Sequence, residues 1–225
     1  MENLLALVIS YFLGSIPTAY IVGKTLKGID VTAVGSKTAG GANIWHTVSK
    51  KASVLVSLAD IAKGALAVVL AKALSLGLPF QIACGLLAIA GHNWSPFLRF
   101  KGGRGMACGG GMALILAPWQ LLTISPLILP GLILKNLSLA AIISVLSLPL
   151  FTWVMTQNST LTLGIAGIPL LMIIKRIAAN WEPFTPGEPG YSVIIYRIML
   201  DRDILDREPW IKRNVAKNPG GKNPE

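Results

Sequence analysis

The sequence has few charged residues, since Asp, Glu, Lys and Arg make up only 13% of its 225 residues. A soluble domain carries about 25%, so the deficit excludes an ordinary water-soluble enzyme and a disordered chain. Only two cysteines and two histidines are present, which excludes a disulfide-rich secreted domain and leaves a zinc site without enough ligands. We expect Cys84 and Cys108 to be ordinary apolar packing residues. Hydrophobic residues make up 53% of the chain, which is typical of a membrane protein.

Acidic residues are almost missing from residues 1–176, which hold three of them against thirteen basic residues. Residues 177–225 hold seven of each kind. A net charge of +10 can indicate nucleic-acid binding, but here the excess lies between apolar runs. That pattern is typical of a multi-pass membrane protein with basic cytoplasmic loops. We therefore expect contact with membrane lipid and no nucleic-acid partner.

Apolar runs approach the length of a membrane span, about 20 residues, at seven places, and they predict an all-α integral membrane fold. The predicted spans are 4–22, 53–76, 80–97, 106–117, 120–134, 138–156 and 161–175. The fourth is short, and a Pro118 break within one longer helix would give six spans instead. Seven spans with the N-terminus outside and the C-terminus cytoplasmic place these basic residues inside: Lys24, Lys27, Lys37, Lys50, Lys51, Arg99, Lys101, Arg104, Lys135, Lys175 and Arg176.

The chain divides into a membrane domain, residues 1–180, and a cytoplasmic tail, residues 181–225. The tail starts with a linker rich in proline and glycine. Residues 191–207 then predict one amphipathic helix that rests on the cytoplasmic face of the bundle or on lipid. We expect the end, residues 218–225, to be disordered.

Polar groups in and beside the spans indicate the candidate site, because lipid excludes such groups unless they have a function or a partner. The loop after the first span contains Gly35, Ser36, Gly40 and Asn43, and its glycines let backbone N–H groups converge on an anion. The same composition is also typical of a flexible loop.

The second predicted span contains two charged residues, Asp60 and Lys63, which share one face at a spacing of three. A structural ion pair and a functional cavity are equally compatible with this spacing. His92, at the inner end of the third span, is more typical of a packing or hydrogen-bonding residue than of a catalyst.

The segment 99–105, Arg-Phe-Lys-Gly-Gly-Arg-Gly, holds three basic residues and three glycines in seven positions. It leads into a helix whose N-terminus offers free N–H groups and a partial positive charge. The spacing does not match the nucleotide P-loop. These features predict a site for a phosphorylated, membrane-soluble substrate at the cytoplasmic interface. Motifs for a protein nucleophile are missing, so covalent catalysis is not indicated.

These segments together resemble the bacterial acyl-phosphate:glycerol-3-phosphate acyltransferases (PlsY). The shared residues run in order along residues 1–180: YFLGSIP at 11–17, Gly35-Ser36 with Gly40 and Asn43, DIAKG at 60–64, GHNWSPFLRFKGGRG at 91–105, and Arg176 with Asn180. The tail lies outside the resemblance.

The resemblance implies a multi-pass protein of the bacterial inner membrane with its active site on the cytoplasmic side. A fatty acyl group passes from acyl phosphate to the 1-hydroxyl of glycerol 3-phosphate in phospholipid biosynthesis, giving lysophosphatidate without a metal or cofactor. The implied catalytic residues are Ser36, Lys101 and Arg104. The implied substrate-binding residues are Gly35, Gly40, Asn43, Asp60, Lys63, His92, Gly102, Gly103, Gly105, Arg176 and Asn180.

Several positions depart from the family pattern. The loop usually written GSGNxGATN is GSKTAGGAN at 35–43, and the usual GGKG carries Arg104 in place of lysine. His46, Ala141 and Ile177 replace an arginine, a serine and a histidine of the family. Two further interpretations therefore stay open: a paralogue that acylates another acceptor, and a non-catalytic membrane binding protein. A small transporter is less favoured, because the glycines and cations gather on one side.

Overall fold

The computed structural model describes residues 2–134, 136–206 and 210, and all regular elements in them are helices. The predicted disorder of 218–225 falls outside these residues. The elements are α1 (Glu2–Ser15), α2 (Thr18–Lys27), α3 (Gly41–Thr47), α4 (Lys50–Ala73), α5 (Leu78–Asn93), η1 (Pro96–Leu98), α6 (Met106–Leu116), α7 (Pro118–Ile124), η2 (Ser125–Ile128), α8 (Leu129–Ile133), α9 (Leu137–Thr156), α10 (Ser159–Ala178), η3 (Ala179–Trp181) and α11 (Gly190–Leu200).

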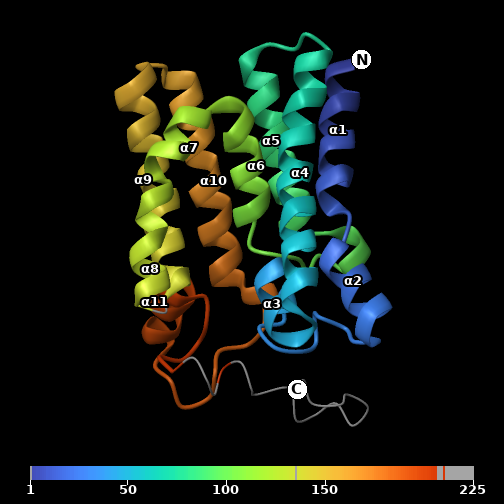
Figure 1. Cartoon of the computed structure of the whole chain (residues 1–225), viewed down its shortest axis with the longest axis vertical. Coiled ribbons are helices and arrows are strands. Elements are labelled where there is room, and N and C mark those ends of the chain that lie inside the picture. The colour runs from blue at the N-terminus through green and yellow to red at the C-terminus, as the bar shows by residue number, and fades with distance from the viewer. Residues whose placement is uncertain (1, 135, 207–209, 211–225) are drawn as a thin grey trace.

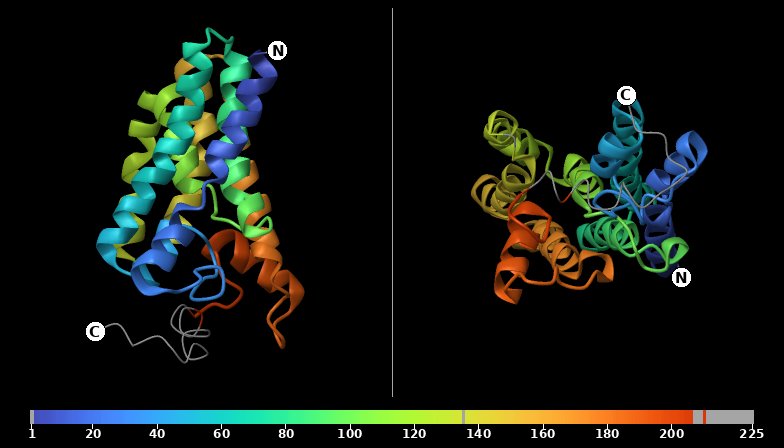
Figure 2. Two further views of the ribbon diagram at one scale, coloured as in Figure 1. Left: turned by 90° about the vertical axis from the view of Figure 1, so that its right-hand side faces the viewer. Right: turned by 90° about the horizontal axis from the view of Figure 1, so that it is seen from below.

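The described residues include four helical segments that are long and apolar enough to cross a membrane: Asn3–Lys27, Lys50–Ala73, Leu137–Thr156 and Ser159–Trp181. The shorter apolar segments Met106–Leu116 and Pro118–Ile133 stand among them, whereas Gly190–Leu200 lies at the lower end of the bundle (Figure 1). Viewed from below, the helices form one bundle, with α10 packed against α5 (Figure 2). The prediction of an all-α integral membrane protein is confirmed, while the count of seven spans stays a prediction.

The first predicted span, 4–22, lies within the apolar helical segment Asn3–Lys27, which is broken at Pro17. α1 ends at Ser15 and α2 begins at Thr18, because Pro17 cannot donate a helical hydrogen bond. The break leaves the carbonyl of Ile16 available to a side chain, and Nζ of Lys63 donates to it at 2.7 Å. The proline thus creates a polar joint inside the bundle.

The short fourth run forms a helix of its own, α6, with 11 residues. It stops before Pro118, and Ala117 has non-helical backbone, with φ −144° and ψ 54°, because a following proline disfavours helical backbone. The next run is divided into α7, η2 and α8 and lies beside α9 (Figure 1). The chain is thus broken at Pro118, and the counts of seven and six spans both stay predictions.

The tail helix is shorter than the predicted 191–207. α11 ends at Leu200, and Asp201 follows it with left-handed backbone, φ 56°. α11 packs against α9 and α10, and its side chains Val193 and Arg197 are buried. Of the two surfaces expected for this helix, it therefore rests on the bundle.

The main apolar core lies between α4, α5, α6, α9 and α10 and includes Ile89, Met112 and Ile165. Cys84 and Cys108 are free and buried in apolar clusters, which confirms their predicted packing role.

Glycines bring α4 and α6 into backbone contact. A Cβ atom added to Gly64 would lie 1.9 Å from the carbonyl oxygen of Cys108, and one added to Gly111 would lie 1.9 Å from that of Ile61. Close approach over small residues is a common way for membrane helices to pack, since lipid provides no hydrophobic force between them. The glycines before the start of α6 therefore belong to a loop, whereas those after it allow close helix packing.

We expect Gly111→Ala to destabilise the bundle by about 1–3 kcal/mol, because the new methyl group can be accommodated only by separating two backbones. Gly110→Ala is the matched control, since a Cβ atom there meets nothing within 4 Å. Thermal unfolding of both variants in one detergent measures the difference. Equal unfolding temperatures would contradict the backbone contact between α4 and α6.

Candidate active site

The loop between α2 and α3 is held in shape by Asn43, which is 2% exposed. Its Nδ2 atom donates to the carbonyls of Val31, Val34 and Thr38 at 2.8, 3.1 and 3.0 Å, respectively. Its Oδ1 atom accepts from the backbone N–H of Ser36 at 3.1 Å. The amide of Asn43 is thus fully occupied with this loop, and it determines where Ser36 lies.

A second loop, residues 101–105, connects η1 to α6 and lies on the end of α5. The N–H of Gly103 donates to the carbonyl of His92 at 3.1 Å. A Cβ atom on Gly103 would lie 2.0 Å from Nε2 of His92, so the loop can pack on this ring only as glycine. Gly105 precedes α6 with φ 77°. We call residues 101–105 the glycine loop.

Asn180 joins these two loops, which are distant in the sequence. Its Oδ1 atom accepts from the N–H of Gly102 at 3.1 Å. Its Nδ2 atom donates to the carbonyl of Lys37 at 2.8 Å and to that of Gly102 at 3.1 Å. Ala39 adds a backbone hydrogen bond to the same Gly102 carbonyl at 3.1 Å. The loop of Ser36 and the glycine loop are therefore neighbours in the structure.

We expect Asn180→Asp to lower the acyl-transfer activity that the family resemblance implies by more than about tenfold, because the carboxylate keeps the size of the amide but cannot donate to the two carbonyls. Initial rates with purified protein measure the effect. The matched control is Asn158→Asp at the start of α10, where the side chain only accepts, from the N–H of Leu161 at 2.9 Å. Full activity of Asn180→Asp would show that the two loops do not need this bridge.

Arg104 leaves the glycine loop toward α10. Its Nη1 atom donates to the carbonyl of Lys175 at 3.0 Å, and its Nε atom lies 2.6 Å from Oδ1 of Asp201. The second contact is an ion pair whose angle is outside the range of a hydrogen bond. Arg104 also interacts electrostatically with the buried Lys175 and Arg176. We call Arg104, Lys175 and Arg176 the basic cluster.

Arg176, which the sequence analysis placed in the substrate site, is buried and binds backbone. Its Nη1 atom donates to the carbonyl of Ile198 in α11 at 2.5 Å, and its Nη2 atom donates to that of Ser138 in α9 at 3.4 Å. Arg176 therefore ties three helices together and adds positive potential to the basic cluster.

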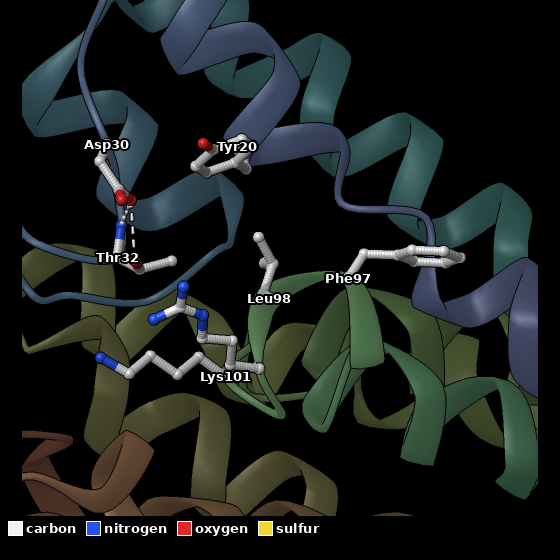
Figure 3. Close-up of a pocket in the computed structure, with 7 residues that line it drawn as sticks. Tyr20, Asp30, Thr32, Phe97, Leu98 and Lys101 are labelled. Carbon is white, nitrogen blue, oxygen red and sulfur yellow. Dashed lines mark hydrogen bonds between the residues drawn. The ribbon is translucent and has the colours of Figure 1, made fainter.

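Lys101 points to a different place, a cavity of about 380 Å³ between α2 and η1. Figure 3 shows Lys101 extended beneath Thr32, with Leu98 facing Tyr20. The cavity is lined by Tyr20, Asp30, Thr32, Phe97, Leu98, Arg99 and Lys101. Its apolar side continues to α1, where the ring of Phe97 lies 6.3 Å from that of Phe12. Lys101 and Arg104 thus act on different sides of the glycine loop.

Asp60 and Lys63 form a buried network rather than an open pair of charges. The three donors of the Lys63 ammonium group are used by the Ile16 carbonyl, by Thr18 Oγ1 and by Asp60 Oδ1, at 2.7, 2.8 and 2.7 Å. His92 Nδ1 lies 3.5 Å from the same Asp60 oxygen. Of the two interpretations that the sequence left open, this network favours a structural ion pair over a functional cavity. It leaves Lys63 no free donor for a substrate.

Residues 4–183 match the family model described as "Glycerol-3-phosphate acyltransferase". The chain belongs to this family. A curated relative from Dehalococcoides mccartyi (strain CBDB1), "Glycerol-3-phosphate acyltransferase 4", is 37% identical over 217 residues and covers 94% of each chain. The "Glycerol-3-phosphate acyltransferase" of Prochlorococcus marinus (strain NATL2A) is 37% identical over 182 residues, which are 80% of this chain and 91% of the relative.

Two crystal structures of the family member PlsY, an integral membrane glycerol 3-phosphate acyltransferase, are similar to this fold. Its glycerol 3-phosphate form has a TM-score of 0.71 at 29% identity, covering 78% of this chain and 88% of that one. Its lysophosphatidic acid form has a TM-score of 0.69 at 28% identity, with the same coverage. The family resemblance noted in the sequence is therefore confirmed.

Three residues that reach this acyltransferase site were not among the residues predicted from sequence. Lys175 precedes Arg176 in the last turn of α10, so its position was a usable signal. Glu182 pairs with Lys37 at 2.6 Å, and Asp201 pairs with Arg104. No local pattern predicts these two contacts, because they form only when the chain turns back after α10.

Proposed function

We infer that this protein transfers a fatty acyl group to glycerol 3-phosphate and so makes lysophosphatidic acid. The observation that carries this inference is the continuous family match over 4–183, which contains both loops and Asn180. Similar structures of PlsY in glycerol 3-phosphate and lysophosphatidic acid forms support it. The protein is an acyltransferase of phospholipid biosynthesis that is embedded in the membrane.

We propose acyl phosphate as the acyl donor. Its carbonyl carbon is already activated by a phosphate leaving group, so the protein need not supply a nucleophile. The 1-hydroxyl oxygen of glycerol 3-phosphate forms the new C–O bond, the bond from the carbonyl carbon to the phosphate oxygen breaks, and inorganic phosphate leaves. The hydroxyl proton passes to an oxygen of the departing phosphate. The protein supplies proximity and stabilises the negative charge on the carbonyl oxygen.

The two sides of the glycine loop suit the two anions of this reaction. We assign the donor phosphate to Lys101 and Arg99, because their cavity joins a basic end to an apolar wall that can take an acyl chain. We assign the acceptor phosphate to Arg104, which remains 12% exposed beside the other basic cluster residues. The N–H groups of Gly102 and Gly103 already donate to Asn180 and His92, so we assign the donors to the reacting carbonyl to the amides of Arg104 and Gly105 and to the Ser36 hydroxyl.

We propose seven spans with the N-terminus outside, and a site at the cytoplasmic face of a bacterial inner membrane. The support is the distribution of charge: Lys24 and Lys27 end α2, Lys50 begins α4, and both ends lie with α3 at the lower end of the bundle (Figure 1). Cysteines introduced at Lys51 and Gln157, which lie at opposite ends, test the orientation by labelling from each side of the membrane.

An acceptor-dependence assay tests the function. Purified protein in detergent receives acyl phosphate with glycerol 3-phosphate, with another polyol phosphate, or with no acceptor, and phosphate release is followed. We expect release only with glycerol 3-phosphate. Release only with the other polyol phosphate would favour the divergent paralogue. A folded protein that releases no phosphate with any acceptor would favour the membrane binding protein. Replacing acyl phosphate by acyl-CoA tests the donor separately.

A further inference from the structure

The segment after the family match folds back onto the active site. The family model ends at residue 183, whereas α11 lies at the lower end of the bundle against α9 and α10 (Figure 1). Two relatives from Dehalococcoides mccartyi align over 94% and 93% of this chain, so their similarity extends into this segment. The segment is therefore a feature of part of the family and is not covered by the shared membrane domain.

The segment is firmly anchored. Arg197 and Asp203 form a buried, two-point ion pair, with Nε to Oδ1 at 2.8 Å and Nη2 to Oδ2 at 2.9 Å. The guanidinium group also donates to the carbonyls of Ile177, Glu182 and Pro183 at 3.0, 3.0 and 3.1 Å. These contacts fix both ends of the chain segment that returns to the bundle to the end of α10. A segment anchored in this way suits a permanent part of the site. The anchoring disfavours a lid that would open in each catalytic cycle.

Asp201 lies between two arginines. Its Oδ1 atom is 2.6 Å from Nε of Arg104, and it also attracts the buried Arg176. Arg104 is held from a second direction by the carbonyl of Lys175, while the described residues give its Nη2 atom no hydrogen-bond partner. The guanidinium group is thus fixed on one edge and has a donor left on the other.

An arginine is the side chain that such an arrangement requires. Its planar group carries five N–H donors in fixed directions, so one edge can bind a carboxylate while another binds a phosphate. A lysine offers three donors on one nitrogen and is oriented much less by a single partner. The replacement of the usual family lysine by Arg104 therefore fits the presence of a carboxylate in the added segment.

We propose that Asp201 is a positioning residue of the acceptor site, which holds Arg104 in the orientation that binds the phosphate of glycerol 3-phosphate. This proposal rests on the function inferred above. The carboxylate does not itself touch the substrate, and the tail is a working part of the active site. The opposite role, a carboxylate that competes with the phosphate for Arg104, predicts changes of the opposite sign.

The first experiment compares Asp201→Asn with Asp206→Asn, an exposed tail residue as the matched control. We expect Asp201→Asn to raise the KM for glycerol 3-phosphate about tenfold, because the ion pair that orients Arg104 is lost, with the KM for acyl phosphate unchanged. Asp206→Asn should resemble the parent. An unchanged or lowered KM in Asp201→Asn, or equal effects on both substrates, would overturn the proposal.

The second experiment tests coupling through Arg104. In an Arg104→Lys background, Asp201→Asn should change the KM for glycerol 3-phosphate much less than in the parent, because lysine is not oriented by the carboxylate. Equal effects in both backgrounds would contradict an action through Arg104. Calorimetry measures the binding of glycerol 3-phosphate to the parent, to each single variant and to the double variant in parallel. Weaker binding by Asp201→Asn supports the positioning role and unchanged binding overturns it, even if the parent protein fails the acyl-transfer assay.

Discussion

Arg104→Ala is expected to lose acyl transfer, with kcat/KM for glycerol 3-phosphate falling by about a hundredfold or more. Arg104 is the partly exposed member of the basic cluster, and its side chain leaves the glycine loop toward α10, where we propose that the acceptor phosphate binds. Its removal takes away charge stabilisation where two anions must come together, and electrostatic repulsion between them is then uncompensated. Initial rates over a range of glycerol 3-phosphate concentrations measure the loss.

Two variants separate this loss from a general effect of charge or stability. Lys27→Ala removes an equally basic but exposed side chain at the end of α2 and should keep full activity. Arg104→Lys should keep part of the activity, because it preserves the charge but not the planar donors. If Arg104→Ala keeps the activity of the parent, the assignment of the acceptor phosphate to Arg104 is wrong. A lowered unfolding temperature would instead trace the loss to the broken contact with Lys175.

Hydropathy and charge were enough to predict the helices α4, α9 and α10, because an apolar run of span length in lipid has no alternative to helix. The same reasoning could not predict the break at Pro17. Two helices and one kinked helix have the same composition, and the freed carbonyl is bound by Lys63, which lies 47 positions away in the sequence. The short length of α6 could be predicted from the sequence, because the helix ends directly before Pro118.

The site was predictable to the extent that its residues lie in motifs. The glycine loop and Asn43 carry local signals, and the structure brings their loops together through Asn180. Lys101 and Arg104 were grouped because they lie close together in one basic, glycine-rich segment, but Lys101 lines the cavity beside Tyr20 whereas Arg104 reaches α10. No sequence pattern indicated Asp201, because its ion pair with Arg104 forms only when Arg197 anchors the tail to the bundle.

Asp60→Asn is expected to destabilise the protein by about 3 kcal/mol or more, the usual result of removing one partner of a buried ion pair. The Lys63 ammonium group, 4% exposed, would keep two neutral acceptors and lose its counter-charge. Thr18 and His92 would keep only a neutral amide oxygen in place of the carboxylate oxygen that they share. Thermal unfolding in a single detergent measures the change.

The double variant Asp60→Asn with Lys63→Met shows whether charge is the cause. Removing both charges should recover much of the lost stability, because no uncompensated ion is left in the bundle. Activity should recover with it, since the network reaches the glycine loop only through His92, whose carbonyl accepts from Gly103 at 3.1 Å. If the double variant is as unstable as Asp60→Asn, the hydrogen bonds at the Pro17 break matter more than the charge pair. If it is stable but inactive, Lys63 has a role in the reaction that its three protein contacts conceal.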